Sequence, residues 1–449
     1  MSAWLKAVRR KRLAVLGIGV GLLLGICVLS SLLVPHRDLI VEAIRSHGYP
    51  VAMSELDPWY PSVPPAENAA LIYTNAFALL TNLTGPNTSF TSALPPIGQG
   101  LAADEESELK DVLADNQAAL RLLYSAPASG HSRYDVHLGD GYNAMLPHLA
   151  KTKQAVTLLS AEGLMHATHG DAERATQAFL AAGRVAESVG DEPTIISQLV
   201  RYADWNVLLP RLERALSLTT FTDHQLAAMQ QMVQGAERPR GMARAMAVER
   251  VCGLNAITDR KVMGMALQQQ GWNHRLAELW TEAPLGLYQV TGLQGKDKAF
   301  YADKMASHIA ALELAYPARA AAGEQMAALT NAPSRFRFYS QLLLPALVKV
   351  HAKDANHVAN VRVAGAALAI ERFRLAHTNA LPDSVEQLAP TYCKTVLADP
   401  FDGKPLRYKT HGASYAVYSI GSDGQDDGGV VWDSNYTKVP QDVAFVVKH

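Results

Sequence analysis

An acidic loop near the C-terminal end of the chain is the strongest candidate for binding chemistry. Residues Asp423–Gly429 read Asp-Gly-Gln-Asp-Asp-Gly-Gly and place three carboxylates within five positions. Their mutual repulsion favours either a bound cation or full solvation, and calcium accepts such hard oxygen ligands. The spacing resembles the first half of an EF-hand, but Ser434 stands at the twelfth position, where that loop needs glutamate. An EF-hand is therefore excluded, whereas a calcium loop of another kind and a solvated acidic turn both remain open.

Other stretches with chemically active residues lack the spacing that catalysis needs. His166 and His169 can share one helix face, but a catalytic zinc site commonly needs a third ligand, and the sequence has no His-Glu-x-x-His. Residues 421–424 lack the Gly-x-Ser-x-Gly spacing of a nucleophile elbow. Residues 292–297 are too short for a phosphate-binding loop and end in aspartate. We therefore expect packed or exposed histidines here and no recognisable enzyme class.

Three motifs in the last fifth of the chain follow an apolar helix pattern at 361–376. They are Leu381–Ser384, Asp399–Pro405 and Tyr418–Gly424. Together they resemble the C-terminal domain of the major pseudopilin of type II secretion, over residues 357–449. The resemblance implies a long helix, an Asp-Pro turn, a short antiparallel sheet and a calcium loop.

The same resemblance implies which oxygens would bind calcium. The implied ligands are one main-chain carbonyl and several carboxylates, namely Ile420, Asp423, and Asp426, Asp427 or Asp433. The family also begins with a processing motif, Gly-Phe-Thr followed by two apolar residues and Glu, which has no counterpart in Arg12–Leu23. We therefore interpret the module as a borrowed domain and not as part of a pseudopilus. The whole chain resembles single-anchor envelope proteins of planctomycete and verrucomicrobial bacteria, which combine a helical body with this ending.

The N-terminal region has the pattern of a membrane anchor. Leu13–Val34 is 22 residues without a charge, about 33 Å long as a helix and enough to cross a bilayer once. Five basic residues precede it, namely Lys6, Arg9, Arg10, Lys11 and Arg12. This pattern predicts a bacterial inner-membrane protein with a cytoplasmic tail at 1–12, a transmembrane helix at 13–34 and a periplasmic body. A cleaved signal peptide is the competing interpretation. Small residues on one helix face, Gly17, Gly21 and Gly25, are compatible with a homodimer or simply with the glycine content of membrane helices.

The rest of the chain divides into three regions by composition. Residues 35–66 form a proline-rich connector, and residues 67–356 are rich in alanine and leucine with helical spacing. Breaks are expected at 170–171, 191–193, 222–223, 284 and 332–333, and residues 163–182 resemble one tetratricopeptide-like helix pair. The predicted fold is mainly α-helical: a transmembrane helix, a repeat-like helical body and a small α+β module at 357–449.

Composition and charge limit the classes of partner. Hydrophobic residues make up 49% and charged residues 18% of the chain, which excludes a disordered protein. The net charge of −1 gives no overall field that would attract nucleic acid. Cys252 and Cys393 are the one candidate disulfide pair of the body, and two free, packed thiols are an equal alternative.

The sequence predicts a binding function more strongly than a catalytic one. Helical-repeat character and missing catalytic motifs favour an envelope scaffold that binds another protein and is linked to secretion or envelope assembly. The alternative is an extracytoplasmic hydrolase whose site is assembled from distant residues, because catalytic groups need not be neighbours in the sequence.

Overall fold

The computed structural model describes residues 42, 44–81, 94–127, 131–257, 292–330, 338–429 and 442–449. The helices of this part are α3 (Leu56–Trp59), α4 (Ala69–Leu79), α6 (Ala103–Asp115), α7 (Gln117–Ser125), α8 (His148–Thr168), α9 (Ala172–Glu187), α10 (Ile195–Leu218), α11 (Asp223–Gly235), α12 (Gly241–Ala256), α15 (Leu293–Glu313), α16 (Ala318–Thr330) and α17 (Phe338–Ala376). Short 3₁₀ turns occupy Met53–Glu55, Pro65–Glu67, Leu138–Asn143 and Val385–Leu388. The strands are β1 (Arg407–His411), β2 (Ser414–Ser419) and β3 (Val443–Val447).

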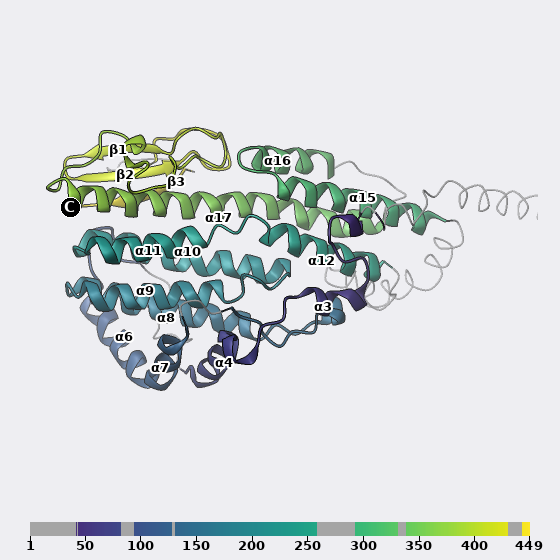
Figure 1. The fold of residues 1–449 in the computed structure, drawn as a ribbon, viewed down its shortest axis with the longest axis horizontal. Helices are drawn as coiled ribbons and strands as arrows, with labels where there is room; N and C mark the ends of the chain where they lie inside the picture. Colours follow the sequence, from purple (N-terminus) through teal and green to yellow (C-terminus); the bar gives the residue numbers. More distant parts are fainter. Residues whose placement is uncertain are drawn as a thin grey trace, which may run out of the picture.

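The elements are stacked in layers around the long helix α17 (Figure 1). The small sheet lies on one side of α17, and α10 and α11 lie on the other side. Beyond them come α8 and α9, and α4, α6 and α7 form the outermost layer. Helices α12, α15 and α16 cover the other half of α17, so the described chain is mainly helical with a single small sheet.

Side-chain caps determine where several helices begin. Asp171, Thr194 and Thr222 each accept a hydrogen bond from the backbone N–H three residues later, at the starts of α9, α10 and α11. Such a cap satisfies an N–H group that has no partner inside the helix. The breaks predicted at these three places are confirmed, whereas those at Pro284 and Pro333 lie outside the described residues.

A glycine allows α8 and α9 to approach closely. A Cβ atom at Gly163 would lie 3.1 Å from ring atoms of Phe179, which is buried in the interface. The two helices are joined by a three-residue turn and contact each other along their lengths. The predicted helix pair at 163–182 is therefore present in the body.

The sheet connects the C-terminal end of the chain to the helical body. Strand β2 is the centre of the sheet and pairs antiparallel with β1 and β3, with Tyr418 opposite Arg407 and Ala444. Tyr415 on β2 donates a hydrogen bond to the Ala367 carbonyl of α17 at 3.1 Å. Residue 357, where the C-terminal module was expected to begin, lies within α17, and the hydrophobic core continues across it.

The membrane prediction has to be corrected. Among the described residues, no helix is both long and apolar enough to cross a membrane. The longest of them, α17, carries Asp354 and Arg362 near its middle, and both form ion pairs inside the protein. This finding contradicts the predicted fold with a transmembrane helix and the predicted single-pass location in the inner membrane. The segment 13–34, with its three spaced glycines, lies outside the described residues.

Both cysteines of the body are free and buried. Cys252 lies on α12 and Cys393 follows the turn Val385–Leu388, and the structure contains no bond between them. Burial raises the pKa of Cys252 to about 12, with the nearby carboxylate of Glu249 adding to the effect. Of the two alternatives left open by the sequence, the packed thiols are confirmed.

A layer of buried polar residues lies between α10, α15, α16 and α17. The carboxylate of Asp354 accepts hydrogen bonds from the hydroxyls of Tyr202 at 2.6 Å and Tyr316 at 2.5 Å, and pairs with Arg319 at 2.6 Å. Asp354 and Arg319 are each less than 6% exposed, so both charges are withdrawn from water. An ion pair at this depth is retained only because its remaining hydrogen-bonding positions are largely filled.

Three histidines in the same layer are buried as well. The Nδ1 atom of His308 lies 2.8 Å from Nε2 of His351, and His357 stacks on Tyr202 with 4.1 Å between ring centres. Burial lowers the pKa of His308 and of His351 to about 4, and that of His357 to about 3. All three rings are therefore neutral in the folded protein at neutral pH.

We predict that these histidines make the fold sensitive to mild acid. Below about pH 6.5 the unfolded chain takes up protons that the folded protein does not bind until about pH 4. The free energy of unfolding should therefore fall as the pH drops from about 6.5 to about 4. The His308→Gln variant should lose stability less steeply than the wild type, by about 1 kcal/mol per pH unit at most. Urea titrations at pH 7.5, 6 and 5 measure this difference, with the exposed His137→Gln as control. Identical slopes for His308→Gln and the wild type would refute the prediction.

Candidate functional site

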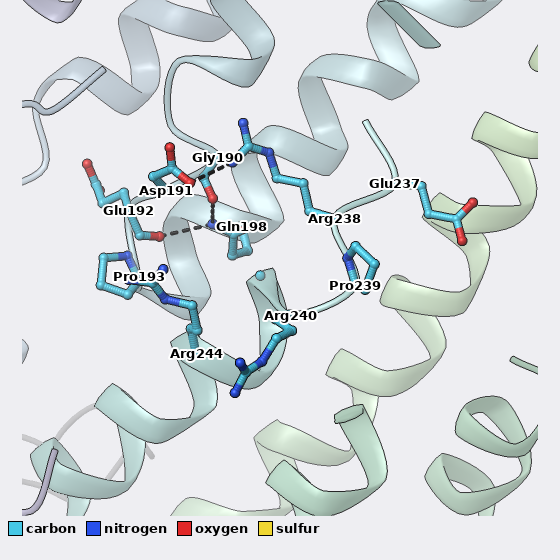
Figure 2. Close-up of a pocket in the computed structure, with 11 residues that line it drawn as sticks. Gly190, Asp191, Glu192, Pro193, Gln198, Glu237, Arg238, Pro239, Arg240 and Arg244 are labelled. Atoms are coloured by element: carbon cyan, nitrogen blue, oxygen red, sulfur yellow. Dashed lines mark hydrogen bonds and ion pairs between the residues drawn. The ribbon is translucent and has the colours of Figure 1, made fainter. Parts of the chain in front are cut away.

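The candidate site is a pocket of about 460 Å³ between two loops of the helical body. One loop joins α9 to α10 and the other joins α11 to α12, so the pocket opens where these four helices end or begin (Figure 2). It is lined by Gly190, Asp191, Glu192, Pro193, Gln198, Glu237, Arg238, Pro239, Arg240, Gly241 and Arg244. We call it the Arg pocket, because three arginines lie within seven positions of one another on its wall.

A single carboxylate, that of Glu187, holds the two loops in place. Its Oε1 accepts hydrogen bonds from Nη1 of Arg201 and from the Trp205 indole, both at 2.8 Å, and its Oε2 accepts one from Nε of Arg238 at 2.6 Å. Burial would raise the pKa of Glu187, but the charges of Arg201 and Arg238 outweigh that effect and hold it at about 2. The carboxylate is therefore ionised at every physiological pH, and the pocket wall bearing Arg238 stays attached to α9.

The floor of the Arg pocket is built around the side chain of Gln198. Its amide group donates to the carbonyls of Gly190 at 3.1 Å and Glu192 at 2.9 Å, as Figure 2 shows. A Cβ atom at position 190 would lie 2.5 Å from the guanidinium carbon of Arg238. A side chain at position 190 would therefore displace the guanidinium of Arg238 from its present place.

A buried polar group behind the pocket looks catalytic in composition but not in geometry. Glu192 is fully buried, and its carboxylate accepts hydrogen bonds from His148 at 2.9 Å and from Ser197. A serine nucleophile needs direct contact with its base, whereas here the carboxylate lies between the serine and the histidine. Ser197 also bonds Thr194 at 2.6 Å and has no exposed surface. This group fixes the α9–α10 loop and has no access to a substrate.

The three arginines differ in what they already bind. Arg238 pairs with Glu187 and with Asp191 at 2.7 Å, and Arg240 pairs with Glu313 at 3.1 Å. Arg244 forms no ion pair with any described residue, and its buried Nε atom has no hydrogen-bond partner among them.

The guanidinium of Arg244 is a cation that forms no ion pair within the described part of the chain. It lies over the ring of Trp59, 4.7 Å from the ring centre. Burial lowers the pKa of Arg244, with Arg240 and Arg238 adding to the effect and Asp191 opposing it. A guanidinium in such surroundings can bind a carboxylate or a phosphate through two parallel hydrogen bonds.

The described residues that were predicted to bind calcium lie in one loop, and two of them accept hydrogen bonds from nearby groups. Oδ1 of Asp423 accepts from the N–H of Gln425 at 3.1 Å, and Oδ1 of Asp426 accepts from the Tyr418 hydroxyl at 3.1 Å. Such bonds are those of a hydrogen-bonded turn. Within the described residues, no group of three or more acidic, histidine or cysteine side chains is placed to hold a metal. Asp433 lies outside the described residues, so the calcium site stays a prediction.

An acidic residue that the sequence analysis missed lies beside this loop. Oδ2 of Asp442 accepts a hydrogen bond from the N–H of Gly429 at 2.6 Å, and its buried Oδ1 has no partner among the described residues. Burial raises the pKa of Asp442, and the charges of Asp426 and Asp427 raise it further. No local pattern could have indicated this residue, because it is brought to the loop by strand β3.

The Asp-Pro turn is structural. The buried carboxylate of Asp399 accepts four hydrogen bonds, from the N–H groups of Phe401 and Ile420 and the hydroxyl of Ser419 at 2.9 Å, and from Arg407 at 2.8 Å. Two of the three motifs that carry the pseudopilin resemblance therefore meet at one carboxylate. The N–H of Ile420, whose carbonyl was predicted to bind calcium, is thereby bonded to Asp399.

The two histidines at 166 and 169 do not form a site together. Nε2 of His166 lies 3.9 Å from Glu162 on the same helix, whereas Nε2 of His169 lies 2.8 Å from Glu106 on α6. Within the described chain, neither histidine belongs to a group of three or more side chains that could hold a metal ion.

We predict that removal of the Asp399 carboxylate unfolds the C-terminal turns. The Asp399→Ala variant leaves four donors without an acceptor, at a cost of about 3 kcal/mol or more in the free energy of unfolding. Asp402→Ala is a matched control, because Asp402 binds the same arginine but is partly exposed. It should cost less than about 1 kcal/mol. Urea unfolding measures both, and equal losses for the two variants would show that the buried network has no special role.

We also predict that calcium stabilises the acidic loop. A bound cation would remove the repulsion between Asp442, Asp426 and Asp427, so millimolar calcium should raise the melting temperature of the wild type. Asp426→Asn should weaken this response, while magnesium at the same concentration should give a smaller one. A melting temperature that does not change with calcium would favour the solvated turn.

Comparison with known proteins adds nothing to this geometry. No protein-family model, curated protein or solved structure matches the chain. The resemblance of residues 357–449 to a pseudopilin domain accordingly rests on the three motifs alone, and the function is argued from the geometry of the Arg pocket.

Proposed function

We propose that this protein is a binding protein that holds an acidic segment of another protein in the Arg pocket. The single observation that carries the proposal is Arg244, a half-buried pocket cation with no carboxylate partner in the described chain. Since Arg238 and Arg240 are already paired, a ligand carboxylate would be drawn to Arg244 and stabilised by the two neighbouring guanidinium groups.

The surroundings of Arg244 support recognition by a rigid site. Trp59 holds the guanidinium from one side and is itself fixed by a hydrogen bond from its indole to the Gly48 carbonyl at 3.1 Å. Glu187 and Gln198 hold the two loops, so little order has to be gained when a ligand binds. Arginine and tryptophan are also the residues on which protein interfaces most often depend.

No observation favours the alternative, a hydrolase. The described residues that line the Arg pocket include no serine, threonine, cysteine or histidine. Ser197, whose hydroxyl donates to Glu192 behind the pocket, is fully buried and so has no access to a substrate.

The proposal predicts that binding depends on the charge of Arg244. A glutamate-glycine peptide of eight residues should bind the purified protein, and Arg244→Gln should weaken the affinity about tenfold or more. Isothermal titration calorimetry at low and high salt measures this affinity, which should fall with salt. The control is Arg174→Gln, because Arg174 is an exposed arginine on α9, away from the pocket.

Two results would contradict the proposal. One is equal affinity of the Arg244→Gln variant and the wild type for the acidic peptide. The other is equal binding of a glutamine-glycine peptide, because an amide lacks the negative charge that strengthens a hydrogen bond to a guanidinium. Free phosphate that displaces the peptide at micromolar concentration would point to a phosphorylated ligand in place of a carboxylate.

A further inference from the structure

A second pocket of about 460 Å³ lies next to the Arg pocket. It is formed by the N-terminal segment Ile44–Tyr49 and one face of α15. Five small or apolar side chains of α15 line it, namely Ala299, Ala302, Ala306, Ile309 and Ala310. We call it the Ala pocket, and its wall is suited to an apolar side chain.

One hydrogen-bonded group separates the two pockets. The Oε1 atom of Glu313 accepts from the Tyr49 hydroxyl at 2.5 Å and from Nη2 of Arg240 at 3.1 Å. Arg240 lines the Arg pocket, whereas Tyr49 and Glu313 line the Ala pocket. The aromatic rings connect the pockets as well, because Tyr49 lies 6.2 Å from Trp59, which carries Arg244 on its face.

The charges around the Ala pocket disfavour an acidic group there. Its described lining includes two carboxylates, Asp303 and Glu313, together with His47 and one arginine, Arg250. The guanidinium of Arg250 is buried and donates to the Pro50 carbonyl at 3.2 Å, so it holds the N-terminal segment. Because the two carboxylates outnumber this one arginine, an acidic side chain is favoured in the Arg pocket and an apolar one in the Ala pocket.

The hydrogen-bonded group of Tyr49, Glu313 and Arg240 limits which kind of ligand could extend from one pocket into the other. A hydrocarbon chain crossing it would cover the polar atoms of Tyr49, Glu313 and Arg240 without offering them hydrogen bonds. A peptide backbone offers a donor and an acceptor at every residue. In an extended segment, side chains two positions apart lie on the same side, about 6.6 Å from each other. This spacing is close to the 6.2 Å between the ring centres of Tyr49 in the Ala pocket and Trp59 beneath Arg244.

From this arrangement we propose that the ligand is an extended peptide segment with an acidic residue and, two positions away, an apolar residue. The acidic side chain binds Arg244 and the apolar side chain enters the Ala pocket, so the two pockets act as one site. This inference rests on the proposed function and adds an apolar residue to the ligand motif that the site recognises.

Three peptides and two variants test it. The peptides are a glycine octapeptide with one glutamate, the same peptide with leucine two positions after the glutamate, and the leucine peptide with glutamine in place of glutamate. Ala306→Phe fills the Ala pocket from an exposed position, and Ala321→Phe places the same side chain on an exposed position of α16 as control. Calorimetry gives each affinity.

The leucine should improve the affinity of the wild type about tenfold or more. Ala306→Phe should remove this gain and leave the affinity for the glutamate-only peptide unchanged, while Ala321→Phe should keep the gain.

Absence of any gain from leucine in the wild type, or a gain that survives Ala306→Phe, overturns the inference but leaves the Arg244-dependent binding of the acidic peptide intact. Loss of Arg244 dependence overturns the proposed function itself. Dodecanoate that competes with the leucine peptide and loses affinity in Ala306→Phe would identify an amphiphile as the occupant and also overturn the inference.

Discussion

The ionised carboxylate of Glu187 is the interaction on which the rest of the site depends. It lies at the last residue of α9 and bonds Arg201 and Trp205 of α10 as well as Arg238 of the α11–α12 loop. Two helices and one loop are thereby joined through one side chain. Loss of this group would leave the buried Arg201 guanidinium with a severe desolvation penalty, because its remaining partners are neutral. The Arg pocket is rigid for the same reason: its wall is attached to the most strongly bound anion of the region.

Small residues are the second requirement of the fold. Polar groups fill part of the space between the helices of the body. Elsewhere the helices must pack closely if water is to be excluded. At Gly253 a Cβ atom would lie 2.1 Å from the Tyr301 hydroxyl, and at Gly183 it would lie 2.2 Å from the Met232 sulfur. These contacts bring α12 to α15 and α9 to α11 at distances that alanine would not permit without movement of a neighbour. The alanine-rich composition of the body is thus a packing property and does not identify a repeat family.

The sequence predicted features that depend on neighbouring residues and missed those that depend on distant ones. Caps such as Thr222 and the Asp-Pro turn at Asp399 act within a few positions, so their patterns are visible in the chain. The Arg pocket combines residues near 190 with residues near 240, and Trp59 comes from still farther away. No periodicity brings such segments together. Only the arrangement of α9 to α12 reveals that Arg244 forms no ion pair with the residues that the structure describes.

The membrane prediction at 13–34 rested on a strong local pattern, and no described helix has the same pattern. Length and lack of charge are sufficient grounds to expect a span, but the described helices are built differently. Their long members alternate apolar residues with buried charges, as Asp354 and Arg362 do on α17. Such charges are stable because tyrosines and arginines of neighbouring helices surround them. The body is therefore organised by polar contacts between helices to a degree that its composition does not suggest.

The contact between strand β3 and helix α10 has a consequence for the order in which this chain can fold during synthesis. The N–H of Val446 donates to the buried Oε1 of Glu213 at 2.7 Å, across 233 positions of sequence. On a ribosome that adds about 5–20 residues each second, Val446 is synthesised more than about ten seconds after Glu213. Until the strand emerges, the edge of α10 that will bury Glu213 faces solvent or a chaperone. The helices that form the layers on the other side of α10 are synthesised well before then. A partly synthesised chain can therefore form much of the core while the side of α10 that packs against α17 and the sheet is still uncovered.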